Sequence, residues 1–319
     1  MSSPVWIGVD IGGTKVLAGV VGPEGTVLRT ARLASPGREA TVAEVEDALS
    51  DAVGAVAAGA RVAGVGIAAA GFVDADGERV RFAPHLPWRD DPVRSRLTER
   101  WGTSVLLEND ATCAAVAESE LGAAHGAGSA VLITLGTGIG GGIAVGGTVL
   151  RGAGGMAGEV GHMKVQPGGA VCECGGRGCW EQYASGPALL RGVRASWERR
   201  GPVLQERTGG DPDQLTGPVV TEAADRGDPL AQEVLEEVGR WLGLGLSNLV
   251  AALDPECVVV GGGLAAAGEA VLAPARRELG AQLVGRGHRT APPVVTALLG
   301  AEAGLVGAAL LARAAASGA

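Results

Sequence analysis

The sequence contains few aromatic residues and few lysines. Aromatic side chains make up 3% of its 319 residues, while the apolar fraction is 46%, so a core must be built from alanine, valine and leucine. Only two of the 26 basic residues are lysines, Lys15 and Lys164. The net charge is −9 and no basic stripe is interleaved with aromatics, which argues against nucleic acid as a partner.

Long apolar runs and a signal peptide are also lacking. No run of about 18 uncharged apolar residues occurs, and the first residues do not combine a charged segment with an apolar one. We therefore expect a cytoplasmic protein without a membrane partner. The length suits two domains or one large domain, and the alternation of predicted strands and helices indicates an α/β fold.

The five cysteines, an odd number, argue against a secreted disulfide framework. Cys113 and Cys257 lie in apolar runs and are predicted to be core residues. The other three, at 172, 174 and 179, share an eighteen-residue stretch with His162.

One imidazole and three thiolates form the donor set that closes a tetrahedron around Zn²⁺ at about 2.0–2.3 Å. Glycines at 175, 176 and 178 allow the backbone to curl back toward one ion. Because four protein ligands leave no position for water, we predict a structural zinc site with the ligands His162, Cys172, Cys174 and Cys179.

Two stretches have the pattern of strand, glycine turn and strand. The first covers residues 5–22, with the turn DIGGTK at 10–15, and the second covers residues 129–147, with LGTG at 135–138. Backbone N–H groups in such turns can bind phosphate, and the repeated plan indicates an internal duplication. Asp10 is interpreted as an outer partner of Mg²⁺. Simple chain reversal is the alternative for each turn, and surface solvation is the alternative for Lys15.

A predicted strand over residues 104–109 gives way to a helix through residue 120. Asp110 lies at this junction, where a carboxylate can act as a general base, although an N-cap role is the alternative. A strand from residue 257 runs into a triple glycine at 261–263, where a planar base or ribose could lie against bare backbone, or the chain could simply turn. Further helices are predicted over 41–60, from 91–92 to 101 with Pro92 at the first helical position, over 187–200, 219–226, 228–253, 269–279 and 302–315, and strands over 61–70 and 294–298.

Taken together, these motifs resemble the ROK family of sugar kinases and repressors, and within it the actinobacterial type of ATP-dependent glucokinase. The motifs are DIGGTK at 10–15, ENDA at 108–111, LGTGIGGG at 135–142, GEVGH at 158–162, CECGGRGCWE at 172–181 and GGG at 261–263. The resemblance implies an actin-like, hexokinase-type (ribonuclease H-like) fold of two α/β lobes with a zinc-binding loop at 162–179. The small lobe would hold residues 1–108 and 303–319, and the large lobe residues 109–302.

The resemblance also implies roles for individual residues. Asp110 would take the proton from the sugar hydroxyl that is phosphorylated, with glucose and Mg²⁺-ATP as the substrates. The implied sugar-binding set is Gly71, Asn109, Asp110, Glu159, His162 and Glu181. The predicted nucleotide-binding set is Asp10, Gly12, Gly13, Thr14, Lys15, Gly136, Thr137, Gly138, Gly261, Gly262 and Gly263.

Several alternatives stay open at this point. The substrate could be another hexose or an N-acetylhexosamine, and polyphosphate could be a further phosphoryl donor. A sugar-sensing regulator is the alternative from another class, but the repressors carry an N-terminal DNA-binding region and only nine residues precede Asp10 here. The resemblance implies a homodimer or homotetramer.

Overall fold

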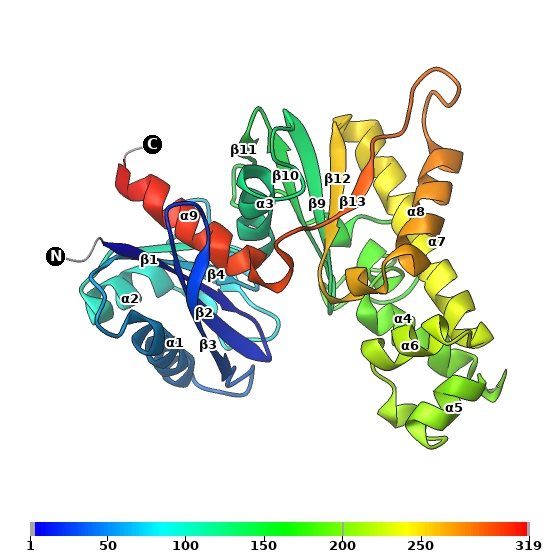
Figure 1. Cartoon of the computed structure of the whole chain (residues 1–319), viewed down its shortest axis with the longest axis horizontal. Helices are drawn as coiled ribbons and strands as arrows, with labels where there is room; N and C mark the ends of the chain where they lie inside the picture. Colours follow the sequence, from blue (N-terminus) through cyan, green and yellow to red (C-terminus); the bar gives the residue numbers. More distant parts are fainter. Residues whose placement is uncertain (1–3, 200, 318–319) are drawn as a thin grey trace. The chain divides into compact units, whose positions relative to one another are not determined.

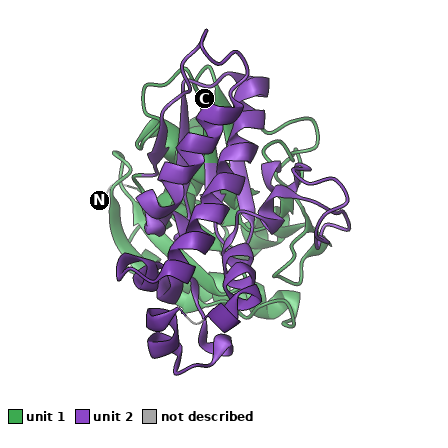
Figure 2. Ribbon diagram, turned by 90° about the vertical axis from the view of Figure 1, so that its right-hand side faces the viewer, with its two compact units in different colours: residues 1–132, 142–158, 298–319 green, residues 133–141, 159–297 purple. Residues whose placement is uncertain are grey.

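The computed structural model describes residues 4–199 and 201–317, which form two compact units (Figure 2). Unit 1 comprises residues 1–132, 142–158 and 298–319, and unit 2 comprises residues 133–141 and 159–297. These units differ from the predicted lobes in residues 109–132, 142–158 and 298–302, which all lie in unit 1. The predicted lobe boundaries at 108/109 and 302/303 remain a prediction.

Unit 1 contains a five-stranded sheet in the order β3-β2-β1-β4-β8 (Figure 1). Strands β3, β2 and β1 pair antiparallel, β4 pairs with β1 in parallel, and β8 pairs with β4 in parallel. The strands are β1 Val5–Ile11, β2 Lys15–Val21, β3 Val27–Ala34, β4 Val62–Ala69 and β8 Val105–Asn109. The predicted hairpin of residues 5–22 is therefore confirmed.

The alternation of side chains along the strands gives this sheet two different faces. Ile7, Val9 and Ile11 of β1 belong to one buried cluster with α1 (Val42–Ala57) and α2 (Val93–Trp101). The opposite face contacts α9 (Ala303–Ser317), which in turn packs on α3 (Asp110–Glu120). Gly8 and Gly66 lie on that face, and their lack of a Cβ lets α9 approach closely.

A second five-stranded sheet has the order β11-β10-β9-β12-β13. Its strands are β9 Ser129–Leu135, β10 Ile139–Val145, β11 Thr148–Val149, β12 Cys257–Gly261 and β13 Val294–Thr296. As in the first sheet, three strands that are consecutive in the chain, here β9, β10 and β11, share the sheet with two later strands. These two strands, β12 and β13, pair in parallel. This repetition supports the duplication that the two glycine turns indicated. A small third sheet contains β5 Phe72–Val73, β6 Val80–Phe82 and β7 Arg89–Asp91.

The helices of unit 2 include α7, whose 25 residues pack along α8. Asp228 begins α7 as its N-cap and also accepts hydrogen bonds from the N–H groups of Val203 and Leu204 at the start of α5. The α-helices are α4 Gly186–Ala195, α5 Pro202–Thr208, α6 Gly217–Asp225, α7 Pro229–Leu253 and α8 Glu269–Gln282. Short 3₁₀ helices are η1 Val160–His162, η2 Trp180–Gln182, η3 Trp197–Arg199, η4 Pro212–Gln214 and η5 Gly263–Ala267, with η6 Gly300–Glu302 in unit 1.

The predicted α/β class is confirmed, with three local corrections. Pro92 is the N-cap of α2 and not its first helical residue. The helix predicted over 187–200 ends at Ala195 and is followed by η3, while residue 200 lies outside the described residues. Strands β3, β6, β7 and β11 and helix α5 were not predicted. Among the described residues, no helix is long and apolar enough to span a bilayer.

Candidate functional site

The junction of β8 and α3 in unit 1 carries Asn109 and Asp110. Asn109 is the N-cap of α3, because its side-chain oxygen accepts a hydrogen bond from Thr112 N at 3.0 Å. Its Nδ2 donates to the carbonyl oxygen of Gly71 at 3.1 Å and to Asp110 Oδ1 at 3.1 Å. The N-cap alternative for Asp110 is therefore wrong. Asp110 begins the helix, and its carboxylate also accepts from Ala111 N at 2.8 Å.

Burial, followed by the charge of Asp10, raises the pKa of Asp110 to about 7. Burial likewise raises the pKa of Asp10, against the effect of Lys15, whose Nζ lies 3.2 Å from Asp10 Oδ2. A carboxyl group that ionises near neutral pH can accept a proton efficiently at that pH. Asp110 thus has the chemistry of a general base.

Glu108 and Arg151 support this junction, and neither was predicted to do so. Glu108 is 4% exposed, and its carboxylate accepts from Asn109 N at 2.8 Å and from Arg151 Nε at 2.5 Å. Arg151 also donates to the carbonyl oxygens of Ala75 at 2.5 Å and Asp74 at 3.2 Å. A glutamate inside a buried strand needs a partner of opposite charge. The glutamate of the motif ENDA, Glu108, could therefore have indicated that a basic residue lies beside it.

The turn between β1 and β2 contains the first predicted phosphate contacts. Gly12 N donates to the carbonyl oxygen of Lys15 at 3.1 Å, which closes the turn. A Cβ on Gly13 would lie 2.5 Å from the Cβ of His85, so this position requires glycine. Thr14 is exposed and available to a ligand, whereas Lys15 already pairs with Asp10.

The turn between β9 and β10 contains Gly136, Thr137 and Gly138. Gly136 N donates to the carbonyl oxygen of Gly138 at 3.0 Å, and the carbonyl oxygen of Gly136 accepts from Gly186 N at 2.9 Å. A Cβ on Gly138 would lie 2.5 Å from Glu181 Oε2. Within unit 2, the turn therefore lies directly beside one of the predicted sugar-binding carboxylates.

The triple glycine follows β12 as predicted. Gly262 has φ +85°, and a Cβ there would lie 2.4 Å from the carbonyl oxygen of Leu135. A Cβ on Gly261 would lie 3.0 Å from the Cβ of Ala297, whereas nothing lies within 4 Å of such an atom on Gly263. Packing and backbone conformation require glycine at 262, Gly261 is tightly packed against Ala297, and Gly263 presents open backbone.

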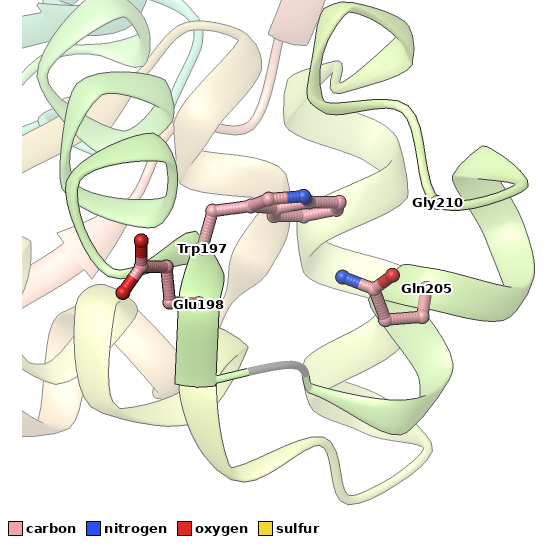
Figure 3. A pocket seen from close by; sticks show the side chains of 4 residues that line it. All are labelled: Trp197, Glu198, Gln205 and Gly210. Atoms are coloured by element: carbon pink, nitrogen blue, oxygen red, sulfur yellow. The ribbon is translucent and has the colours of Figure 1, made fainter.

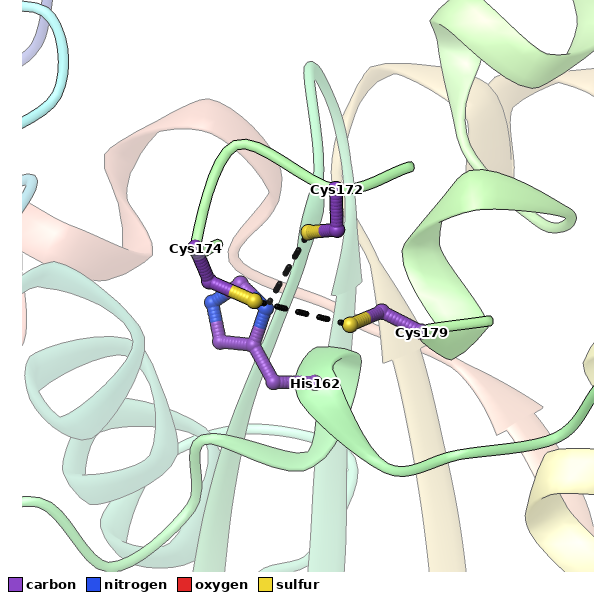
Figure 4. Close-up of side chains that lie close together, drawn as sticks. All are labelled: His162, Cys172, Cys174 and Cys179. Atoms are coloured by element: carbon purple, nitrogen blue, oxygen red, sulfur yellow. Dashed lines mark hydrogen bonds between the residues drawn. The ribbon is translucent and has the colours of Figure 1, made fainter. Parts of the chain in front are cut away.

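The four predicted metal ligands come together in unit 2 (Figure 4). One ligand atom from each of His162, Cys172, Cys174 and Cys179 lies within 4.8 Å of all the others. Cys174 Sγ is 3.6 Å from Cys179 Sγ, and Cys172 Sγ is 3.7 Å from His162 Nδ1. A tetrahedron with metal–ligand distances of about 2.0–2.3 Å has edges of about 3.3–3.8 Å. This donor set and these separations therefore fit a metal ion.

The loop between these ligands is tightly curled. Gly175 and Gly178 have φ of +86° and +73°, which glycine adopts readily. Cys172 N donates to the carbonyl oxygen of Gly176 at 2.9 Å. All five cysteines are free, and Cys113 and Cys257 are buried as predicted.

Two carboxylates flank the imidazole of this cluster. Glu181 Oε1 lies 3.6 Å from His162 Nδ1 and accepts from the Cys172 thiol at 3.0 Å. Glu159 Oε2 lies 3.8 Å from His162 Nε2. The two ring nitrogens thus face different partners, Nδ1 toward the sulfurs and Nε2 toward Glu159.

A separate pocket of unit 2, about 460 Å³ in volume, is lined by Trp197, Glu198, Gln205 and Gly210 (Figure 3). None of its lining residues belongs to the sugar-binding, nucleotide-binding or metal-binding sets predicted from the sequence. The indole of Trp197 lies across it, and Glu198 supplies its one charged side chain. We assign no role to this pocket in the chemistry.

A model of the ROK family matches residues 6–315. The chain belongs to the ROK family. Glucokinase from Streptomyces coelicolor is 43% identical over 310 residues, which are 96% of this chain and 97% of that protein. The crystal structure of a ROK family glucokinase from Streptomyces griseus in complex with glucose and AMPPNP matches with a TM-score of 0.90 at 44% identity, over 97% of this chain and 99% of that one. ROK hexokinase from Thermus thermophilus matches with a TM-score of 0.79 at 37% identity, over 99% and 100% of the two chains.

Within this ROK protein, the predicted site residues divide between the two units. Unit 1 holds Asp10, Gly12, Gly13, Thr14, Lys15, Gly71, Asn109 and Asp110. Unit 2 holds Gly136, Thr137, Gly138, Glu159, His162, Glu181 and Gly261 to Gly263, together with the three cysteines of the predicted metal site. The ROK membership confirms the predicted actin-like, hexokinase-type fold.

Proposed function

We propose that this chain is an ATP-dependent glucokinase that converts glucose to glucose 6-phosphate. Its similarity over nearly the whole length to glucokinases is the observation that carries the proposal. The environment of Asp110 supports it independently, because its pKa of about 7 suits a base that works at neutral pH.

Phosphoryl transfer requires positioning, charge neutralisation and a hydroxyl group in line with the phosphorus atom. Asp110 would accept the proton of the sugar hydroxyl as that oxygen attacks the γ-phosphorus of ATP. Asn109, which is assigned to the sugar-binding set, would orient the Asp110 carboxylate, since its Nδ2 already donates to Asp110 Oδ1. Sugar contacts are further assigned to Gly71 in unit 1 and to Glu159, His162 and Glu181 in unit 2.

The nucleotide would enter with Mg²⁺, which neutralises phosphate charge. Asp10 is assigned as an outer partner of that ion, in keeping with the preference of Mg²⁺ for carboxylates and water. The turns at 12–15 and 136–138 are assigned to the phosphates, and Gly261 to Gly263 to the adenosine.

The cysteine cluster is proposed to hold Zn²⁺ with the ligands His162, Cys172, Cys174 and Cys179. Bound there, the ion supplies structural cross-linking of the loop and no open position for chemistry. The orientation of His162 then leaves Nε2 beside Glu159, where both groups can contact the sugar.

A homodimer or homotetramer and a cytoplasmic location remain predictions from the sequence.

The test is release of ADP from Mg²⁺-ATP with glucose, mannose, fructose, N-acetylglucosamine and N-acetylmannosamine. We expect the highest kcat/KM on glucose. The variant Asp110→Asn should lower kcat about 10²–10⁴-fold while glucose binding, measured by calorimetry, changes only a few-fold.

Asp51→Asn is the matched control, because Asp51 is an exposed carboxylate on α1 in the same unit. It should retain full activity. A normal kcat in Asp110→Asn would remove Asp110 from the role of base. Tight sugar binding without ADP release on any sugar would instead support the sensor alternative.

A further inference from the structure

The two lysines of this arginine-rich chain both contact anionic or sulfur groups. Lys15 Nζ lies 3.2 Å from Asp10 Oδ2, and Lys164 Nζ donates to Cys179 Sγ at 2.8 Å. An ammonium group is a compact charge, whereas a guanidinium group is a planar fork that needs more space. The position of Lys164 beside a metal ligand is unexplained by the roles assigned above.

Backbone pairing and the absence of a side chain at residue 176 allow Lys164 to lie beside the sulfur atoms. Lys164 and Cys179 form an isolated antiparallel β-bridge, so the two side chains start from paired positions. A Cβ on Gly176 would lie 2.5 Å from Lys164 Nζ and 3.5 Å from Cys174 Sγ. The absence of a side chain at residue 176 therefore leaves the space that the ammonium group occupies next to the sulfurs.

A cluster that has bound a metal ion carries a negative charge, which the ammonium group of Lys164 can stabilise. Three thiolates and a neutral imidazole around a divalent ion leave a net charge of −1. Cys179 Sγ is buried, so water does little to stabilise that charge, whereas Lys164 reaches it from the exposed side of the loop. A hydrogen bond from a charged donor to an anionic acceptor is about twice as strong as a neutral one.

We propose that Lys164 is the charge partner of the metal-bound thiolates, with its Nζ donating to Cys179 Sγ and thereby retaining the metal in the loop. Cysteines bind a metal as thiolates, so the loaded cluster carries the negative charge that the Lys164 ammonium group can stabilise. Lys164 consequently stabilises the loaded form over the empty one. This inference rests on the proposed zinc site and is independent of the sugar that the enzyme phosphorylates.

The experiment measures zinc content by mass spectrometry and the rate of zinc transfer to an excess of a chromogenic chelator at pH 7.5. Lys164→Met nearly keeps the length of the side chain but removes the charge. Losing a partner of a metal ligand typically costs about 10–100-fold in metal affinity, and with an unchanged association rate we expect release to be faster by the same factor. Lys164→Arg, which keeps the charge without the compact shape, should release zinc at an intermediate rate. Lys164→Gln provides a second uncharged variant if the methionine variant folds poorly.

Arg177→Gln is the matched control. Arg177 lies in the same loop and is exposed, and its Nε donates to the carbonyl oxygen of Gly168 at 3.4 Å. This variant loses one positive charge from the loop without losing a donor to sulfur, so its release rate should equal that of the wild type.

Equal release from Lys164→Met and the wild type would overturn the inference, as would equally fast release from Arg177→Gln. A wild-type protein that contains no zinc would overturn both the zinc site and the role of Lys164. ADP release with glucose by that same preparation would then leave the kinase proposal standing, so the two failures are distinguishable.

Discussion

The protonation state of the Asp110 carboxyl group changes near neutral pH. Its pKa is raised to about 7 by burial and by the charge of Asp10. A general base must be ionised, so activity should fall as pH decreases through about 7 and reach a plateau above it. The measurement is kcat/KM for glucose between pH 5.5 and 9 at saturating Mg²⁺-ATP, which reports the pKa of the glucose-free enzyme. A profile that stays flat down to pH 5.5 would contradict the assignment.

The variant Asp10→Asn separates the two causes of this shift. Removal of the like charge at residue 10 should move the apparent pKa in the profile to lower pH, because only burial then raises the pKa of Asp110. This shift is independent of how much activity the variant retains. An unchanged midpoint would mean that the profile reports another group.

At the scale of elements, the contact between α9 and the first sheet depends on two glycines. A Cβ on Gly66 of β4 would lie 1.9 Å from the carbonyl oxygen of Ala308, and one on Gly8 of β1 would lie 1.8 Å from that of Leu305. Neither carbonyl group can rotate away, because both belong to helix α9. We predict that Gly66→Ala lowers the free energy of unfolding by about 3 kcal/mol, as measured by urea denaturation.

Gly54→Ala is the control for this prediction. Gly54 is exposed on α1, and nothing lies within 4 Å of a Cβ at this position. Alanine should therefore stabilise the protein by about 0.5–1 kcal/mol, since it restricts the unfolded chain and favours the helix. Equal losses in both variants would show that the approach of α9 is not the cause.

At the scale of the whole molecule, the loop of the proposed metal site contacts the 25-residue helix α7. Trp180, which follows Cys179, is fully buried, and its Nε1 donates to the carbonyl oxygen of Trp241 on α7 at 2.7 Å. A Cβ on Gly245 of α7 would lie 1.9 Å from the Trp180 ring. The conformation of the loop is therefore coupled to the packing of helix α7 in unit 2.

Removal of the metal by a strong chelator under reducing conditions should loosen this region. We expect faster hydrogen exchange in residues 160–184, a lower melting temperature and weaker glucose binding, because ligand residues that lose the ion also lose their positions. Strands β1 and β4 of unit 1 should keep their protection, and added Zn²⁺ should restore the rest. Unchanged exchange in residues 160–184 after complete removal would contradict a structural role.

Features that depend on residues close in the chain could be predicted from the sequence. The four predicted metal ligands come together because a loop of eighteen residues with several glycines brings them within reach of one another. A helix was predicted over residues 228–253, and α7 covers Pro229–Leu253. The first hairpin was predicted from the pattern of strand, glycine turn and strand around DIGGTK. Short sequence separation made these contacts nearly independent of the rest of the fold.

Features that depend on distant residues were decided by the tertiary structure. Glu108 and Arg151 are 43 residues apart, and no local pattern indicates that they pair. The pKa of Asp110, at the start of α3, depends on Asp10 of strand β1, and Lys164 meets Cys179 only through the backbone pairing of the loop. The sequence alone determined which residue types could carry the chemistry. The packing of strands and helices decided their partners and charges, because electrostatic effects depend on distance in space and on burial.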